Sequence, residues 1–233
     1  MTGTVVNCLA IIAGTLIGLL FKRGIPENYK TTIMQGISLA VIIIGIKSAL
    51  SSDDFLIVIV SIALGSIVGE VLKIEDNLGK LGLFLEKKIQ RKSNNSKGNF
   101  AKGFVTATLI FCVGSMAIVG SLESGLSGNH QTLFAKSILD GIASVIFAST
   151  LGIGVAFSAF TVFIYQGFIT LSAGFIKPFL IEAVIAQMSA TGGILIMGIG
   201  FNLSGIAKIK VGNMLPAVFI PLLYYMVRLM VGL

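Results

Sequence analysis

Long apolar segments alternate with short polar ones along the whole chain. A helix needs about 20 mainly apolar residues to cross a lipid bilayer, and eight segments of that kind are present. The membrane-spanning helices that this pattern predicts are 4–21, 31–50, 55–73, 104–122, 132–152, 154–175, 180–201 and 211–231. The boundary between the fifth and sixth is the weakest, because no charged loop separates them, so seven or nine spans stay open as alternatives.

The composition indicates a chain that is solvated mainly by lipid. Hydrophobic residues make up 55% of the 233 residues, charged residues make up 12%, and the mean hydropathy is +0.98. Soluble domains carry about 25% charged residues. One His and two Cys, Cys8 and Cys112, are too few for a zinc or iron–sulfur site, so no metal or cofactor is expected. We therefore predict an all-α fold, a polytopic transmembrane helical bundle that forms one domain over residues 1–233.

The positions of Lys and Arg predict the orientation of the chain, because basic loops stay on the cytoplasmic side of a membrane. Basic residues follow the first, third and seventh predicted spans, whereas the loops after the second, fourth and sixth carry a single lysine, Lys177. This pattern predicts that both termini are extracytoplasmic. The N-terminal stretch has neither a charged region nor a small-residue cleavage site, so the first span is interpreted as a retained helix rather than a signal peptide.

Positive charge, +7 overall, is densest in residues 76–102. Leu78, Leu81, Leu85 and Ile89 recur there at helical spacing, with lysines on the opposite face. This pattern is typical of an amphipathic helix that lies on a membrane surface and contacts anionic lipid headgroups. No aromatic residues interleave the lysines as stacking platforms for bases, so nucleic acid is not an expected partner.

The second and seventh predicted spans share a pattern. Each has a glutamine near its start, Gln35 and Gln187, and each ends on a Gly-Ile and a Leu-Ser pair. The two spans cross the membrane in opposite directions, so the pattern predicts an inverted-topology repeat of spans 1–3 against spans 6–8. Secondary transporters commonly use that architecture for alternating access, although channels and proteins that transport nothing can have it as well.

Glycines are unusually dense in the seventh predicted span. Four of them, Gly192, Gly193, Gly198 and Gly200, lie close together. Because glycine adds little restraint to the backbone, this segment could be flexible or broken and expose its carbonyl groups to a cavity. Close packing of helix backbones is the alternative interpretation.

Ionisable side chains within a membrane are costly and therefore are candidate functional groups. Asp140 lies about 12 Å into the fifth predicted span, at 1.5 Å per residue. Lys136 precedes it by four residues on the same face of the helix, and Glu123 lies at a depth from which it can contact Lys136. The carboxylate is either a titrating or cation-binding group that faces a cavity, or half of a structural Lys–Asp pair.

Five amides form a second set of candidates: Asn7, Gln35, Gln187, Asn202 and Asn213. An amide within the membrane can line a path for a polar solute, or it can join helices by hydrogen bonds. The relation of Gln35 to Gln187 in the predicted repeat favours a shared central site.

The chain carries no known catalytic motif. Neither a Gly-x-Ser-x-Gly elbow, a His-Glu-x-x-His pair nor a phosphate-binding glycine loop occurs. A dyad of Lys136 with Ser137 or Ser144 is the one enzymatic alternative. We therefore expect that the protein is not an enzyme.

Three short motifs support a family resemblance. They are Gly-Thr-Val-Val-Asn at 3–7, Lys-Arg-Gly-Ile-Pro-Glu at 22–27 and Val-Gly-Asn-Met-Leu-Pro-Ala at 211–217. With these motifs the chain resembles the bacterial membrane family known as domain of unknown function 554. The resemblance implies a multi-span protein of the bacterial cytoplasmic (inner) membrane, related to transport and without an established substrate. It assigns no catalytic or binding residue.

These features together predict a transporter of a small solute or an ion, with a polar site near the bilayer midplane drawn from spans 2, 5 and 7. Asp140 is the expected titrating group. A channel-like pore and a non-transporting scaffold or sensor are the alternatives. At 24.5 kDa the chain is small for a transporter, so a homodimer is considered as well.

Overall fold

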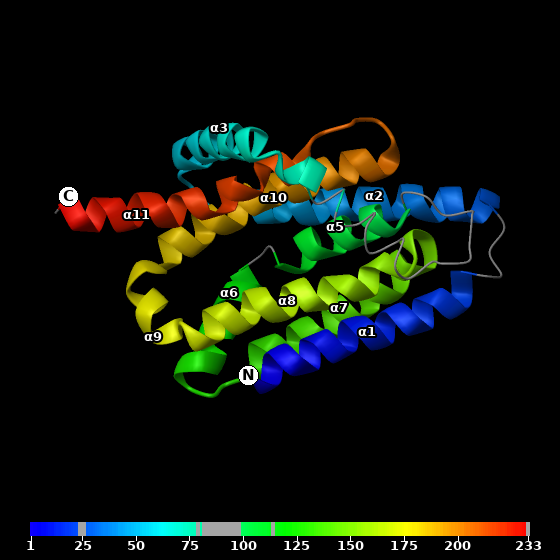
Figure 1. The fold of residues 1–233 in the computed structure, drawn as a ribbon, viewed down its shortest axis with the longest axis horizontal. Coiled ribbons are helices and arrows are strands. Elements are labelled where there is room, and N and C mark those ends of the chain that lie inside the picture. The colour runs from blue at the N-terminus through cyan, green and yellow to red at the C-terminus, as the bar shows by residue number, and fades with distance from the viewer. Residues whose placement is uncertain (23–26, 78–79, 81–98, 113–114, 232–233) are drawn as a thin grey trace. The chain divides into compact units, whose positions relative to one another are not determined.

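The computed structural model describes residues 1–22, 27–77, 80, 99–112 and 115–231. Within them, every regular element is a helix (Figure 1), so the all-α prediction is confirmed. The elements are α1 (Thr2–Lys22), α2 (Glu27–Ala49), α3 (Phe55–Leu72), α5 (Asn99–Cys112), α6 (Ser115–Leu126), α7 (Gln131–Leu151), α8 (Gly154–Leu171), α9 (Ala173–Ile176), the 3-10 helix η1 (Lys177–Phe179), α10 (Glu182–Ser204), the 3-10 helix η2 (Val211–Phe219) and α11 (Ile220–Val231).

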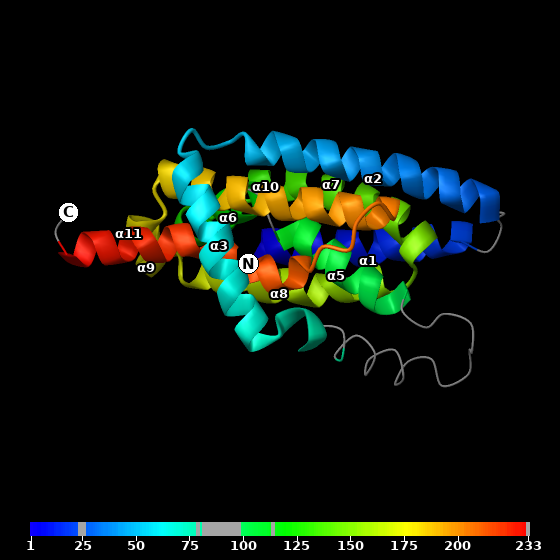
Figure 2. The same ribbon diagram turned by 90° about the horizontal axis from the view of Figure 1, so that it is seen from above.

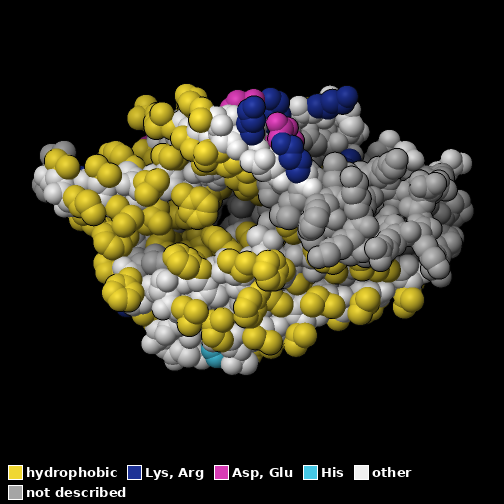
Figure 3. All heavy atoms as spheres, viewed as in Figure 1, with side chains coloured by type: hydrophobic (Ala, Val, Ile, Leu, Met, Phe, Trp, Pro, Cys, Tyr) yellow, Lys and Arg dark blue, Asp and Glu magenta, His cyan; other side chains and the backbone are white. Residues whose placement is uncertain are grey.

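The described helices suit a polytopic membrane protein. Seven spans are long and apolar enough to cross a bilayer, or eight when α5 and α6 are counted as one bent span, as the sequence predicts. Large apolar side chains are exposed along them, for example Leu56 and Val71 of α3 and Met230 of α11. On the face of the molecule that Figure 3 shows, hydrophobic side chains (yellow) are widespread, and the charged ones are gathered in a small area. A surface of this kind is stable in lipid.

The fourth and eighth spans differ from the continuous helices that were predicted. In place of one helix over 104–122, α5 and α6 meet at an angle of 61°, and residues 113–114 between them lie outside the described residues. The eighth span begins as the 3-10 helix η2, which contains Pro216. Proline has no N–H to donate to the preceding turn, which favours a departure from α-helical bonding there.

The chain divides into two compact units that interleave along the sequence. The first unit contains residues 1–34, 76–112 and 116–173, and therefore α1, α5, α7, α8 and almost all of α6. The second unit contains residues 35–75, 113–115 and 174–233, and therefore most of α2 and α9 together with α3, η1, α10, η2 and α11.

In the first unit, α1 and α7 run parallel to each other. Gly3 lies against Leu133, Gly14 against Gly141, and Gly18 against Val145. A Cβ atom at Gly14 would collide with the carbonyl oxygen of Gly141. Small residues therefore let these two backbones approach closely, as is common between helices in lipid.

Helix α8 runs antiparallel to α1 and in the same direction as the bent span. Gly167 lies against Met1, and the Cys8 thiol contacts the carbonyl oxygen of Ala159 at 3.2 Å. Gly154, at the start of α8, packs on Phe100 near the start of α5. Near the end of α8, the carbonyl of Thr170 packs on Gly125 of α6. The bent span therefore meets α8 near both of its ends.

In the second unit, α2 and α10 run antiparallel and pack side by side (Figure 2). Gly45 lies against Gly193 and Met197, and Gly200 lies against Ile42. Opposite directions of these two helices are what an inverted repeat requires. The repeat itself stays a prediction.

The expectation that the glycines of the seventh span break it is not met. Helix α10 is continuous from Glu182 to Ser204 through Gly192, Gly193, Gly198 and Gly200. A Cβ atom at Gly45 would lie 2.6 Å from the backbone nitrogen of Met197, so the contact leaves no room for larger residues. Packing, the alternative interpretation, explains this segment.

The basic segment 76–102 falls largely outside the described residues, because 78–79 and 81–98 are not described. Its amphipathic helix and its contact with anionic headgroups therefore stay predictions.

Candidate polar site in the membrane-spanning helices

An ion pair lies in the middle of α7. The Nζ atom of Lys136 donates to both carboxylate oxygens of Asp140, at 2.9 Å to Oδ1 and 2.7 Å to Oδ2. Both side chains are 8% exposed. Asp140 is one residue from the centre of a 21-residue helix, so the pair lies near the depth at which a bilayer is most apolar.

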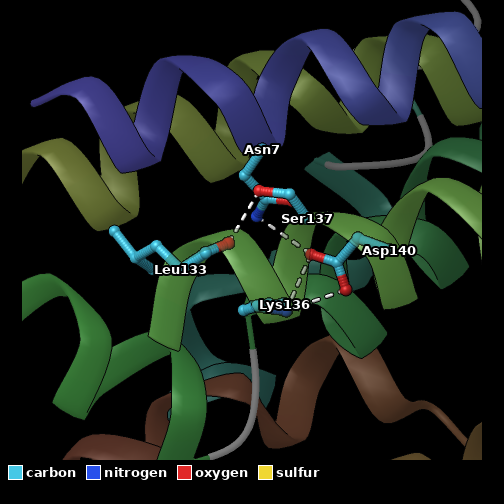
Figure 4. A network of polar contacts seen from close by, with 5 residues as sticks. All are labelled: Asn7, Leu133, Lys136, Ser137 and Asp140. Atoms are coloured by element: carbon cyan, nitrogen blue, oxygen red, sulfur yellow. Dashed lines mark hydrogen bonds and ion pairs between the residues drawn. The ribbon is translucent and has the colours of Figure 1, made fainter. Parts of the chain in front are cut away.

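A second helix contributes to this site. The Nδ2 atom of Asn7 on α1 donates to Oδ2 of Asp140 at 3.0 Å (Figure 4). Its Oδ1 atom is buried and has no hydrogen-bond partner in the described part of the chain. The hydroxyl of Ser137 is engaged with the carbonyl of Leu133 at 2.7 Å. Within the described residues, the site therefore consists of the ion pair, the amide nitrogen that donates to it and an amide oxygen without a partner.

The span formed by α5 and α6 is broken. Helix α5 ends at Cys112, and the two helices meet at an angle of 61°. A helix end leaves backbone groups without intrahelical partners. In a membrane such groups are tolerated where they are buried in protein or face water.

Glu123 does not join the pair. Its Oε2 atom accepts a 2.7 Å hydrogen bond from the hydroxyl of Thr132, while the bonds described for Lys136 go to Asp140. Of the predicted site residues, the structure therefore brings together Asn7, Lys136 and Asp140.

Gln35 and Gln187 lie at opposite ends of the α2–α10 pair. The hydroxyl of Ser51 donates to the carbonyl of Ala186 at 3.0 Å, which places Gln187 beside the end of α2. Gly200 packs on Ser38 near the other end, so Gln35 lies beyond that contact. Gln35 is exposed and Gln187 is buried. They do not converge on one site.

Asn202 closes a turn instead of lining a path. Its Nδ2 atom donates to the carbonyl of Ile209, and its Oδ1 atom accepts from the backbone N–H of Ile209, both at 2.7 Å. Both polar atoms of the amide bond to backbone. Asn202 therefore joins two segments of the chain by hydrogen bonds, which was the alternative to lining a path for a solute.

Asn213 holds α3 to η2 in the second unit. Its Nδ2 atom donates to Glu70 at 2.6 Å, and its Oδ1 atom accepts from the backbone N–H of Glu75 at 2.7 Å. The Glu75 carboxylate accepts in turn from the N–H of Gly212 at 2.7 Å. Lys210 pairs with Glu70 at 2.8 Å on the surface. This polar latch, formed by residues 70–75 and 210–213, explains the polar residues at the start of the Val-Gly-Asn-Met-Leu-Pro-Ala motif.

One buried amide was not singled out from the sequence. Gln166 of α8 is fully buried, and neither its Nε2 nor its Oε1 atom has a partner in the described residues. The signal was an amide within an otherwise apolar span, the same signal that pointed to Asn7.

Comparison with known proteins identifies the family. Residues 2–226 match the family described as "Protein of unknown function (DUF554)". The chain belongs to this family. A relative from Bacillus subtilis (strain 168), named "Uncharacterized membrane protein YdfK", is 36% identical over 225 residues, which cover 95% of this chain and 94% of the relative. The "Uncharacterized protein YqgA" of Escherichia coli (strain K12) is 28% identical over 220 residues, 94% of this chain and 93% of that protein. No solved structure matches.

The family assignment confirms the resemblance inferred from the motifs. With its apolar helices, this member of the family is a membrane protein. The names of the relatives state no substrate, so the chemistry has to be argued from the residues of this chain.

Proposed function

We propose that this membrane protein transports a small polar solute or an ion, and that Asn7, Lys136 and Asp140 form the polar centre of its path. The observation that carries the proposal is the buried ion pair at the middle of α7, to which Asn7 of α1 also donates. Secondary transporters commonly place their sites near the bilayer midplane.

The cost of the pair argues for a role beyond packing. Removing two charges from water costs several kcal/mol per ion, and apolar residues of similar volume often hold a protein core together equally well. Small residues already bring α1 and α7 into close contact at Gly14 and Gly141. A charged pair at this depth is therefore expensive if it serves only to join helices.

The geometry also suggests how the site works. Lys136 occupies both oxygens of Asp140, so a cation or a proton has to compete with this lysine for the carboxylate. Protonation of Asp140 would release Lys136 and weaken the bond from Asn7 to the carboxylate. The site would then change its hydrogen bonding as a coupling ion binds and leaves, which an alternating mechanism needs.

One observation favours a second candidate, a non-transporting scaffold or sensor. The pair is closed on its own helix, and α2 and α10 are in close contact at Gly45, Gly193 and Gly200. In that case the pair would only stabilise the packing of the first unit, and its replacement by apolar residues would leave every flux unchanged.

The setting of the protein is part of the proposal. From the basic loops we infer the cytoplasmic (inner) membrane, extracytoplasmic termini and contact of residues 76–102 with anionic headgroups. We infer no enzymatic activity and no nucleic-acid partner, and a homodimer is the assembly to test.

Membrane-impermeant maleimide tests the orientation. It should label Lys208→Cys only from the cytoplasmic face and Asn129→Cys only from the other face. Both variants are made on a background that lacks Cys8 and Cys112.

Flux through proteoliposomes tests the function. Vesicles that contain a pH-sensitive dye are exposed to proton, Na⁺ and K⁺ gradients, and uptake of glycerol and acetamide is followed by light scattering. We expect the wild-type protein to give a flux above that of protein-free vesicles. Asp140→Asn should abolish this flux. Glu123→Gln, a carboxylate whose bond is to Thr132, is the matched control and should keep the flux. Wild-type flux in Asp140→Asn would remove the pair from the mechanism.

A further inference from the structure

Gln166 presents a buried amide that nothing in the described chain satisfies. Its side chain is 0% exposed, and neither Nε2 nor Oε1 has a hydrogen-bond partner among the described residues. Buried polar groups are nearly always paired, and an unpaired one costs more than a typical hydrogen bond contributes. Such an exception calls for a ligand or water that completes it.

Several buried hydroxyl groups in the described residues share this property, among them three on α1, α6 and α8. Thr4 of α1, Ser121 of α6 and Thr170 of α8 are all at least nine-tenths buried, and each has a hydroxyl oxygen without a partner in the described residues. Thr170 lies one turn after Gln166, on the same face of α8. Every one of these side chains belongs to the first unit.

The packing places Thr4 at the level of Gln166. Because α8 is antiparallel to α1, with Met1 at Gly167 and Cys8 at Ala159, the turn of α1 that contains Thr4 lies beside residues 162–166.

The same comparison places Ser121. Gly125 packs on the carbonyl of Thr170, and Ser121 lies one turn before Gly125 on α6, so Ser121 and Thr170 are at the same end of the first unit. Leu133 contacts both Gly3 and Gly120, the residues that precede Thr4 and Ser121. Three helices therefore bring the four polar side chains to one end of the first unit.

We propose that Gln166, Thr4, Ser121 and Thr170 bind a small uncharged solute that carries both hydrogen-bond donors and acceptors, such as a simple amide or polyol. The four side chains carry no charge. A bare cation would leave the Nε2 donors of Gln166 unpaired, and a bare anion would leave its Oε1 acceptor unpaired. A neutral molecule with both kinds of group satisfies the amide and the hydroxyls together.

The solute site lies next to the polar centre. Asn7 is one turn along α1 from Thr4. Its Nδ2 atom donates to Asp140, and its Oδ1 atom has no partner in the part of the chain that is described. This amide oxygen can accept from a solute that leaves the Gln166 site. The inference rests on the proposed transport function and names its substrate class, while Asp140 and Lys136 carry the coupling charge.

Uptake of acetamide and glycerol into proteoliposomes, followed by light scattering, tests the site. Gln166→Leu keeps the bulk and removes both polar atoms, and we expect uptake to fall at least tenfold, because sites built around hydrogen bonds depend strongly on them. Gln131→Leu, an exposed amide at the start of α7, is the matched control and should keep the wild-type rate. Thr4→Val and Thr170→Val, which keep the shape, should each lower uptake and provide the result if Gln166→Leu does not fold.

The possible failures are distinguishable. Unchanged solute uptake in Gln166→Leu, together with a flux that Asp140→Asn abolishes, would overturn the solute site and leave the transport proposal standing. Wild-type vesicles that gain permeability to water but to neither solute would show that these side chains bind water alone, which overturns the inference. If neither the solutes nor the ions cross faster than in protein-free vesicles, both proposals are overturned.

Discussion

Asn7 and Asp140, which are 133 residues apart in the chain, are joined by a 3.0 Å hydrogen bond within buried surroundings. The bond connects the first helix of the protein to the charged pair in the middle of α7. Because α1 and α7 run parallel and touch through glycines, a change in the charge of Asp140 acts directly on α1. The polar centre is thus an assembly of two helices rather than a property of α7 alone.

The buried pair predicts a strong non-additivity between two substitutions. Lys136→Met leaves the Asp140 carboxylate without its counter-charge and should destabilise the protein by about 3–5 kcal/mol, whereas the double variant Lys136→Met/Asp140→Leu should recover most of that loss. Thermal unfolding of the purified protein in detergent measures both. Equal losses in the single and double variants would show that the two residues do not act as a pair.

The contact between α1 and α7 predicts a steric effect at Gly14. A Cβ atom there meets the carbonyl oxygen of Gly141, so Gly14→Ala should force the helices apart and cost about 1–3 kcal/mol. Gly36→Ala is the matched control, because nothing lies within 4 Å of the added atom, and it should be neutral or stabilising by up to about 1 kcal/mol. Equal unfolding temperatures of the two variants would contradict the close packing.

Hydropathy predicted most of the fold because each span has to bury about 20 residues in lipid, a requirement that is local in the sequence. The bend between α5 and α6 was not predictable in this way. The segment around it is as apolar as a continuous span, so hydropathy gives no sign of the bend.

Side-chain partners explain the remaining differences at the site. Asn7, Asn202 and Gln166 look alike in the sequence, as amides in or near apolar spans. In the structure, Asn7 bonds to a charged side chain and Asn202 bonds to backbone, whereas Gln166 has no partner among the described residues. Gln35 and Gln187 match in position along their spans, but antiparallel packing puts matching positions at opposite ends.

The polar latch predicts different costs for its buried and exposed members. Asn213 is buried and accepts from the N–H of Glu75, so Asn213→Ala should leave that donor unpaired and cost about 1–3 kcal/mol. Lys210→Met removes an exposed ion pair, which solvent and salt screen, and should change stability little. Chemical or thermal unfolding in detergent compares the two. A larger loss for Lys210→Met than for Asn213→Ala would show that the ion pair, rather than the amide, holds α3 to η2.

The two hydrogen bonds between Asn202 and Ile209 predict that loss of the Asn202 amide makes the loop between them sensitive to protease. Both hydrogen bonds of its amide go to Ile209, so Asn202→Leu should release residues 205–210, in which Lys208 is exposed. Trypsin should then cut after Lys208 faster than in the wild type, because cleavage follows the population of the open loop. Asn202→Asp keeps the acceptor and loses the donor, so its cleavage rate should fall between the two. Asn129→Leu, an exposed amide in the first unit, controls for the loss of an amide as such. Cleavage of Asn202→Leu at the wild-type rate would show that the loop is held by other contacts and that Asn202 is available to line a path after all.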